Sequence, residues 1–208
     1  MPARRRSQKA RSYHHGDLRR ALLDAALEIL DESGVSGLSL RGAARRAGVS
    51  HAAPAHHFGD LWGLHCAIAE EGFAQLGEHM GAAGAKAHTP GERLERYGVA
   101  YVDFAVRRPG RFRAMFHPWI ADRTGPASLR RAADAAYALL LDVVRDAQAA
   151  GQLRAGSPPL LALSAWVPVH GLATLAIDGQ LMGKGFPSRD PVQLAERILR
   201  ELGGGLRH

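Results

Sequence analysis

The side chains best suited to chemistry in this 208-residue chain are arginines and histidines gathered in residues 38–58, which read LSLRGAARRAGVSHAAPAHHF. Arg41, Arg45 and Arg46 occur there with no acidic residue between them. Uncompensated guanidinium groups suit binding to the phosphates of a nucleic acid, because each one can pair with a phosphate and release its counterions. The chemistry indicated is therefore the binding of a polyanion.

Two short helices separated by a turn are expected to position these side chains. Ser39 is placed to cap a helix that ends at about residue 47, and Gly48 supplies the permissive backbone of the turn. Ser50 is placed to cap a second helix that ends near residue 57. This pattern predicts a helix-turn-helix whose second helix enters a DNA groove.

The overall charge agrees with an anionic partner. Lys and Arg number 27 against 20 Asp and Glu, and the net charge is +7. Residues 1–13 contain five basic side chains and no acidic one, which predicts a flexible basic arm that is either solvated or follows DNA.

A single cysteine, Cys66, cannot form an internal disulfide, and the N-terminus does not resemble a signal peptide. A cytoplasmic, nucleoid-associated location is expected.

Helical periodicity dominates the chain, and no segment shows the alternation typical of a strand, so we expect an all-α fold of about nine helices. Residues 14–80 are expected to form the DNA-binding domain, with the helix 61–80 linking it onward. A small-residue segment, 81–88, is a candidate hinge. Residues 89–208 are expected to form a larger domain for effector binding and dimerisation.

The helix predicted for residues 158–181 is apolar on nearly all sides. Its uncharged stretch, residues 160–177, reaches the lower edge of membrane-span length. Pro168 and His170 interrupt that stretch, so a buried helix or a subunit interface is the favoured interpretation, with no membrane involved. Together with residues 190–202 it is expected to form a homodimeric four-helix interface.

Metal binding and catalysis find little support in the residue pattern. Eleven histidines invite a metal site, but adjacent pairs such as His56 and His57 do not converge on one ion when they lie on a helix. No paired acid and base or activated nucleophile is evident, so no cofactor, metal or catalytic residue is expected. Two alternatives stay open, namely a sequence-nonspecific architectural DNA-binding protein and a helical small-molecule carrier that has lost DNA binding.

Several motifs occur in a characteristic order in the N-terminal part of the chain. They are His14-His15-Gly16-Asp17-Leu18-Arg19, Ser39-Leu40-Arg41, Ala47-Gly48-Val49-Ser50 and His57-Phe58. Together they resemble the DNA-binding domain of tetracycline-repressor (TetR) family regulators, and Trp166 with His170 and Gly171 resembles the Trp-His-Gly type of C-terminal ligand-binding domain. The resemblance implies a homodimeric transcriptional regulator, most simply a repressor, that a small, largely apolar effector releases from a pseudo-palindromic operator.

The resemblance also implies roles for individual residues on DNA. Ala55 and Leu61 occupy positions where many relatives carry a phosphate-contacting tyrosine and lysine, which predicts a flatter salt dependence of binding. The implied phosphate contacts are Arg41 and Ser50. The residues implied to face base edges or to end the recognition helix are His51, Ala52, Ala53, His56 and His57.

An effector pocket is expected in the C-terminal half, where aromatic residues are frequent. Most of these side chains are equally compatible with an ordinary core, and His170 with a hydrogen-bonded core histidine. A mainly apolar pocket with few polar anchors would suit a hydrophobic or aromatic compound. The candidate effector-binding residues are Tyr101, Phe104, Phe112, Phe116, Trp119, Trp166 and His170.

Overall fold

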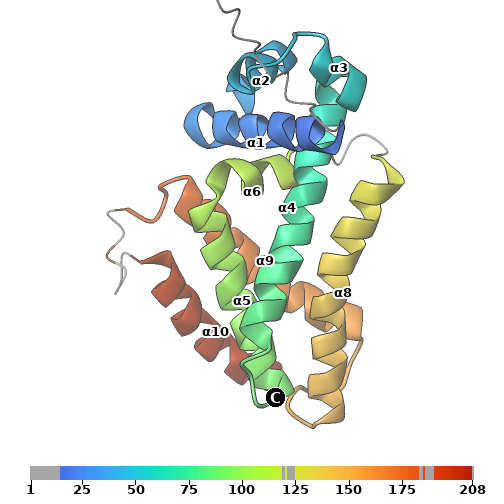
Figure 1. Cartoon of the computed structure of the whole chain (residues 1–208). Coiled ribbons are helices and arrows are strands. Elements are labelled where there is room, and N and C mark those ends of the chain that lie inside the picture. The colour runs from blue at the N-terminus through green and yellow to red at the C-terminus, as the bar shows by residue number, and fades with distance from the viewer. Residues whose placement is uncertain (1–14, 119, 121–124, 183–184, 186–189, 208) are drawn as a thin grey trace, which may run out of the picture.

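A computed structural model describes residues 15–118, 120, 125–182, 185 and 190–207 of the chain, and within these residues every regular element is helical (Figure 1). The expectation of an all-α fold with about nine helices is confirmed. The α-helices are α1 (His15–Ser33), α2 (Leu40–Arg46), α3 (Ala53–Phe58), α4 (Leu61–Gly84), α5 (Pro90–Arg107), α6 (Pro109–Met115), α8 (Ala127–Ala149), α9 (Pro158–Ile177) and α10 (Pro191–Arg207), with a 3-10 turn η1 (Val35–Gly37) after α1.

The first three helices and the start of α4 enclose a small core of their own. Leu23, Leu30, Ala43, Leu64 and Ile68 are among its buried members. α1 ends where Gly34 adopts a positive φ of 68°, which lets the chain turn into η1. Figure 1 shows α1 lying across the top of the remaining helices, with α2 and α3 above it.

The remaining helices form a larger core around α5. Phe104 and Val102 of α5 are fully buried, and α4, α6, α8, α9 and α10 surround this helix. α5 begins with a capping box, because the Thr89 hydroxyl accepts a hydrogen bond from the Glu92 amide at 3.1 Å. The Glu92 carboxylate accepts in turn from the His88 amide at 2.8 Å. These bonds fix where α5 starts and therefore which of its faces meets the core.

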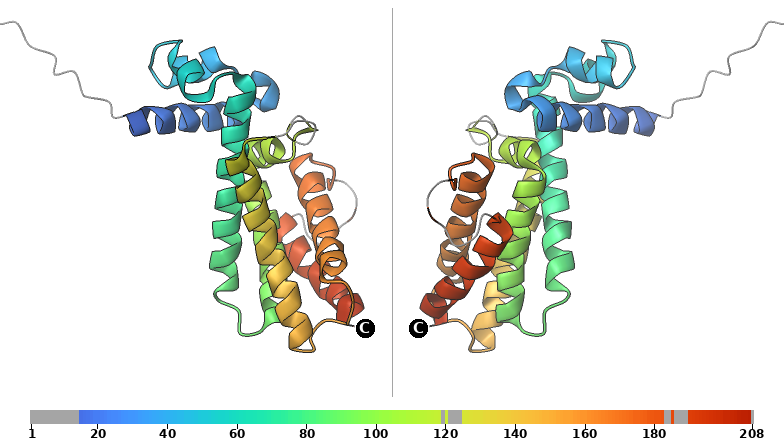
Figure 2. Two further views of the ribbon diagram at one scale, coloured as in Figure 1. Left: turned by 90° about the vertical axis from the view of Figure 1, so that its right-hand side faces the viewer. Right: turned by 90° about the vertical axis from the view of Figure 1, so that its left-hand side faces the viewer.

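α4 belongs to both cores. Leu64 and Ile68 are buried among α1 to α3, whereas Leu76 and Met80 are buried against α5. The helix runs to Gly84, so the first half of the segment expected to be a hinge is helical instead. Figure 2 shows α4 descending without a break from the helix-turn-helix half to the far end of the molecule.

α9 has an unusually apolar exposed side. Leu160, Leu163, Val167 and Leu175 are 58%, 45%, 59% and 46% exposed, although the opposite side packs on α5 and α8. By length and composition alone α9 could cross a membrane, and only 28% of its apolar window is buried. The helix ends at Ile177, four residues before the predicted position, and Gly179 follows with a positive φ of 69°.

Candidate functional site

The helix-turn-helix is built by the local signals that the sequence contains. The Ser39 hydroxyl accepts a hydrogen bond from the Gly42 amide at 3.0 Å and caps α2, as predicted. Gly48 takes a positive φ of 67° in the turn, also as predicted. Pro54 lies in the first turn of α3, where its missing amide hydrogen disrupts no helical bond. These features hold α3 against α2 and α4.

The prediction that Ser50 caps the second helix is wrong. α3 begins at Ala53, its N-cap is Ala52, and no side chain caps it. The Ser50 carbonyl instead accepts from the Ala53 amide at 3.0 Å, so residues 50–52 extend the turn. The Ser50 side chain is exposed, and it is therefore free to meet a phosphate.

The three arginines of the motif differ in their surroundings. Arg46 reaches back to α1, where it forms a two-pronged pair with Glu32, with Nη1 2.6 Å from Oε1. The Arg46 guanidinium lowers the pKa of the Glu32 carboxyl by hydrogen bonding. Arg41 and Arg45 are exposed and have no ion-pair partner among the described residues. Arg46 therefore stabilises the packing of α2 on α1, and Arg41 and Arg45 remain available to phosphates.

The predicted base-facing residues lie in the turn before α3 and on α3 itself. His51, Ala52 and His56 are exposed, and Ala53 and His57 are half-buried. The rings of His56 and His57 lie 5.4 Å apart, edge to face. Arg19 of α1 lies over the Phe58 ring at 5.4 Å, which places a guanidinium close to the end of the recognition helix.

Polar and backbone contacts join this surface to the larger half. Arg20 of α1 donates to Glu71 of α4 at 2.8 Å, Gln75 donates to the same carboxylate at 2.7 Å, and Arg111 of α6 donates to Gln75. α6 also lies so close to the end of α1 that a Cβ on Gly110 would fall 2.6 Å from the Leu30 carbonyl oxygen. Movement of α6 therefore displaces α1.

Trp166 and His170 of α9 meet one phenol of α5. The indole Nε1 of Trp166 donates to the Tyr101 hydroxyl oxygen at 3.1 Å, and that hydroxyl lies 2.7 Å from His170 Nδ1. Residues four apart share a helix face, so the spacing of Trp166 and His170 lets both reach Tyr101. Burial raises the pKa of Tyr101 and lowers the pKa of His170, so it favours the neutral form of both groups.

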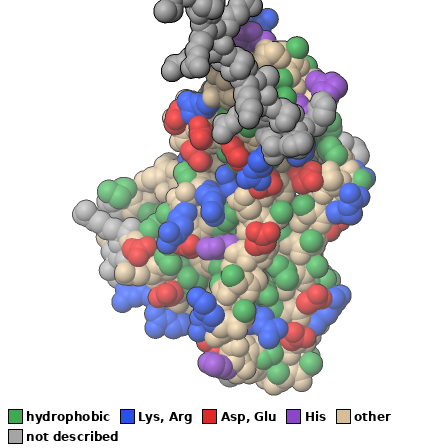
Figure 3. All heavy atoms as spheres, viewed as in Figure 1, with side chains coloured by type: hydrophobic (Ala, Val, Ile, Leu, Met, Phe, Trp, Pro, Cys, Tyr) green, Lys and Arg blue, Asp and Glu red, His purple; other side chains and the backbone are tan. Residues whose placement is uncertain are grey.

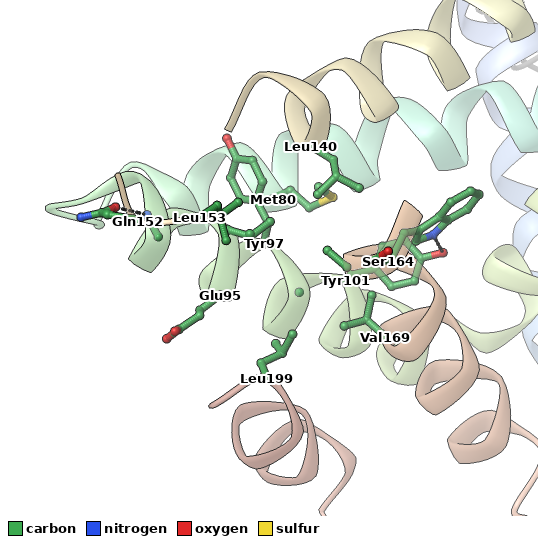
Figure 4. A pocket seen from close by; sticks show the side chains of 15 residues that line it. Met80, Glu95, Tyr97, Tyr101, Leu140, Gln152, Leu153, Ser164, Val169 and Leu199 are labelled. Atoms are coloured by element: carbon green, nitrogen blue, oxygen red, sulfur yellow. Dashed lines mark hydrogen bonds between the residues drawn. The ribbon is translucent and has the colours of Figure 1, made fainter. Parts of the chain in front are cut away.

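Apolar cavities lie on both sides of this hydrogen-bonded group. A cavity of about 390 Å³ lies between α4 and α8, and a smaller one of about 70 Å³ lies between α5 and α9. Figure 4 shows the smaller cavity, with Tyr101 and Val169 on one side and Leu199 of α10 facing them. The cavities share four wall residues, which are Met80, Tyr101, Leu140 and Trp166.

Some polar side chains of these cavities are engaged by the protein, whereas Asp134 in the larger cavity and the Tyr97 hydroxyl in the smaller one make no hydrogen bond among the described residues. Ser164 donates to the Leu160 carbonyl at 2.8 Å, and Gln152 accepts from the Gly91 amide at 2.8 Å. Trp166 and Tyr101 bond to each other. A ligand therefore meets chiefly hydrocarbon and aromatic surface.

The predicted effector residues divide into three groups. Tyr101, Phe116 and Trp166 line the 390 Å³ cavity. Phe112 and His170 line an open groove of about 710 Å³ between α6, α9 and η1, and Phe116 lines it as well. Phe104 is fully buried and lines none of these spaces, and Trp119 lies outside the described residues.

Sequence reasoning did not single out several residues that line the larger cavity, namely Phe73, Leu76 and Met80 of α4 and Leu140 of α8. Tyr137 of α8, an aromatic residue that the sequence also offers for such a pocket, lines the cavity with them. Their helical spacing indicates an apolar face, which is equally typical of a closed core. Tyr137 carries the one further sign, because it is an aromatic residue that stays 37% exposed.

A helix-turn-helix joined through a shared helix to an apolar cavity defines a class of ligand-responsive DNA-binding protein. Residues 94–202, about half of the chain, match the family described as tetracyclin repressor-like, C-terminal domain. The chain belongs to the tetracycline-repressor family of transcriptional regulators. The Trp-His-Gly subtype remains a prediction.

Individual relatives agree with this assignment. The HTH-type transcriptional regulator YobS of Bacillus subtilis (strain 168) is 29% identical over 99 residues, which is 48% of this chain and 51% of YobS. The match thus spans about half the length of that curated relative. A protein of unknown function from Rhodococcus sp. RHA1 is 37% identical, covering 95% of this chain and 100% of its own, with a TM-score of 0.80.

The fold alone is shared with more distant proteins. The transcriptional regulator FadR of Bacillus subtilis, in complex with stearoyl-CoA, is 17% identical and has a TM-score of 0.69. The alignment covers 89% of this chain and 98% of FadR.

Proposed function

We propose that this protein is a cytoplasmic repressor of transcription that binds a pseudo-palindromic double-stranded operator and is released by a small, largely apolar effector. The observation that carries the proposal is the placement of α4, which is packed against the helix-turn-helix at one end and lines the 390 Å³ cavity at the other. A ligand that alters α4 therefore alters the position of α3. A coupling of about 1–3 kcal/mol is enough for a useful response.

Within this proposal residues 14–80 form the DNA-binding domain and residues 89–208 the effector-binding and dimerisation domain. The basic arm of residues 1–13 lies outside the described residues. Arg41 and Ser50 bind phosphates, and His51, Ala52 and Ala53 face base edges, with His56 and His57 at the end of α3. Short side chains at these positions favour contacts with thymine methyl groups. Affinity then depends strongly on phosphate contacts such as those of Arg41.

The exposed apolar face of α9 is the proposed homodimer interface, together with α10. Leu163 and Val167 would otherwise keep hydrocarbon surface in water, at a cost of about 25 cal/mol per Å². A second copy related by a two-fold axis covers both faces at once. Val167→Glu places a charge in that interface, and sedimentation velocity should then show monomer. Val102, by contrast, is buried in the core of a single copy and is no part of the interface. A dimer that persists in Val167→Glu contradicts this interface.

The effector is proposed to occupy the 390 Å³ cavity, with an extension toward the 70 Å³ space. The larger volume lies in the range of roughly 300–1,000 Å³ typical of small-molecule pockets. Because the lining of the larger cavity is mainly hydrocarbon and aromatic, with the exposed Asp134 as the charged residue among those described, an uncharged, mainly hydrocarbon compound fits most of it best. The stearoyl-CoA bound by FadR belongs to that protein, and its charged nucleotide end finds no counterpart in this cavity lining.

The test is a gel-shift titration against the DNA upstream of the gene at physiological salt. A regulator should prefer that DNA over random competitor by at least about a thousandfold. Arg41→Ala should weaken binding to all sequences and reduce the salt slope by about one unit, whereas Arg145→Ala on the surface of α8 should change neither. Binding without sequence preference would instead indicate an architectural protein, and apolar ligand binding without DNA binding would indicate a carrier.

A further inference from the structure

The open groove between the two halves of the molecule has its own chemistry, distinct from that of the cavities. Its volume is about 710 Å³, and its wall combines Val35 and Ser36 of η1 with residues of α6 and α9. Phe112, Phe116 and His170 form its aromatic floor, with the Phe116 and His170 ring centroids 4.7 Å apart. Flat aromatic molecules pack well on such a surface.

The contact with Tyr101 fixes which nitrogen of His170 carries the proton. The Tyr101 oxygen already accepts from Trp166, and its own hydrogen needs an acceptor because the phenol is buried. His170 Nδ1, 2.7 Å away, is that acceptor. The neutral ring therefore carries its hydrogen on Nε2, which has no hydrogen-bond partner among the described residues. His170 lines the groove, which makes this N–H the donor that the ring can offer to a ligand there.

Arg113 supplies a second donor near the other end of the groove. Its Nη2 lies 2.7 Å from an Asp178 carboxylate oxygen and 2.6 Å from the Ile177 carbonyl, so the side chain is held in place. Asp178 balances the charge of the guanidinium, but Nη1 has no partner within the described part of the chain. The groove thus presents a held N–H group with little net charge.

The residues that fix the two donors are separated by about two helical turns along the backbone. Arg113 is held at Asp178, just after α9, and His170 lies eight residues earlier, which at 1.5 Å per residue corresponds to a rise of about 12 Å between their backbones. The two N–H donors require acceptor oxygens on the ligand. The aromatic floor requires that the rest of the ligand be apolar. Among the described residues that line the groove, Asp178 is the one carboxylate, and Arg113 is paired with it.

We propose that this groove is a second ligand site, which binds an uncharged, elongated aromatic compound with a carbonyl oxygen toward each end. One carbonyl accepts from His170 Nε2, and the other accepts from Arg113 Nη1. A negatively charged ligand is less suited, because Asp178 has neutralised the guanidinium. Binding of a ligand in the groove does not depend on the proposed operator function. A ligand that touches both Ser36 and α9 holds the two halves at one angle, and the effect of this on DNA binding rests on the proposed function.

A matched pair of compounds tests the site in equilibrium dialysis. The probes are 4,4′-diacetylbiphenyl and 4,4′-diethylbiphenyl, which have similar shapes and differ in their carbonyl groups. The wild-type protein should bind the diketone about tenfold more tightly, as expected for hydrogen bonds that involve a charged donor. Arg113→Met should reduce the preference to about threefold or less. Equal affinities of the two probes for the wild-type protein, or tighter binding of biphenyl-4,4′-dicarboxylate, would overturn the proposal.

Two space-filling variants locate the preference. Thr174→Phe fills the groove, and Ala133→Phe fills the 390 Å³ cavity. The preference for the diketone should disappear in Thr174→Phe and persist in Ala133→Phe, with both variants confirmed as folded by circular dichroism. The opposite pattern assigns the diketone to the cavity and refutes the groove site. Failure of operator binding leaves this readout intact, so it refutes the proposed function separately.

Discussion

Tyr101→Phe is the most informative single substitution, because it removes one oxygen and leaves the ring in place. That oxygen accepts from Trp166 and donates to His170, so two hydrogen bonds are lost together. Each contributes about 1 kcal/mol to stability. Trp166 and His170 are only half-buried and regain some bonding with water, which limits the further cost. The expected loss is about 2 kcal/mol in the free energy of unfolding.

Tyr97→Phe provides the matched control. Tyr97 lies one turn earlier on α5, lines the same 70 Å³ cavity and is 7% exposed, but its hydroxyl makes no hydrogen bond among the described residues. Its deletion should cost less than about 0.5 kcal/mol. Urea unfolding at one fixed protein concentration measures both variants, because dimerisation makes stability depend on concentration. If Tyr101→Phe is no more destabilising than Tyr97→Phe, the reasoning about this group is wrong.

Three further predictions concern pH, caps and close packing. Burial lowers the pKa of His170, so the unfolded chain takes up a proton at a higher pH than the folded protein does. The free energy of unfolding should therefore fall as the pH decreases below about 6.5. His170→Asn should reduce this pH dependence in urea unfolding, and the remainder comes from His65, whose pKa burial also lowers. Ser39→Ala should cost about 1 kcal/mol of stability, whereas Ser50→Ala should leave stability unchanged and weaken only DNA binding; equal destabilisation of the two variants contradicts the assigned caps. Gly110→Ala should destabilise by about 2 kcal/mol or more through collision with Leu30, while Gly171→Ala, which meets nothing within 4 Å, should not, as differential scanning fluorimetry can show.

The sequence predicted the parts of the fold that depend on near neighbours. Ser39, Asp60 and Thr89 each accept a hydrogen bond from an amide three residues ahead, so their role follows from local spacing. Gly48 likewise meets a purely local requirement for positive φ. Ser50 was mispredicted because serine competes equally well for a turn, and Pro54 shifts the start of α3 to Ala53.

The end of α4 and the site required knowledge of distant contacts. The small residues after Met80 are compatible with a loop, but Tyr97 packs against Gly84 and keeps that turn helical. The bonds of Tyr101 join residues more than sixty positions apart, which no local spacing reveals. Trp166 and His170 were singled out by the resemblance, yet nothing in the sequence predicts that their face of α9 lies between a cavity and a groove.

Surface charge was predicted better than its pairing. Figure 3 shows basic and acidic side chains interspersed over the face that α4 and α5 share, in place of one continuous basic surface. Arg46 illustrates the reason, because its two acidic partners, Glu28 and Glu32, lie on a different helix. A net charge calculated from the sequence treats such arginines as available to DNA, although in the folded protein they are paired with acidic side chains.

The continuity of α4 also determines how the protein unfolds. Leu64 and Ile68 cannot remain buried unless the first turns of α4 are helical, and Leu76 and Met80 impose the same condition on the later turns. Helix formation propagates cheaply from turn to turn, so loss of either core melts the turns that support the other. We therefore expect the two halves to unfold as one cooperative unit, with amide protons near the middle of α4 exchanging only through global opening. A fragment cut after residue 80 loses the partners of Leu76 and Met80, each burial being worth about 2 kcal/mol, and would be a poor substitute for the intact chain.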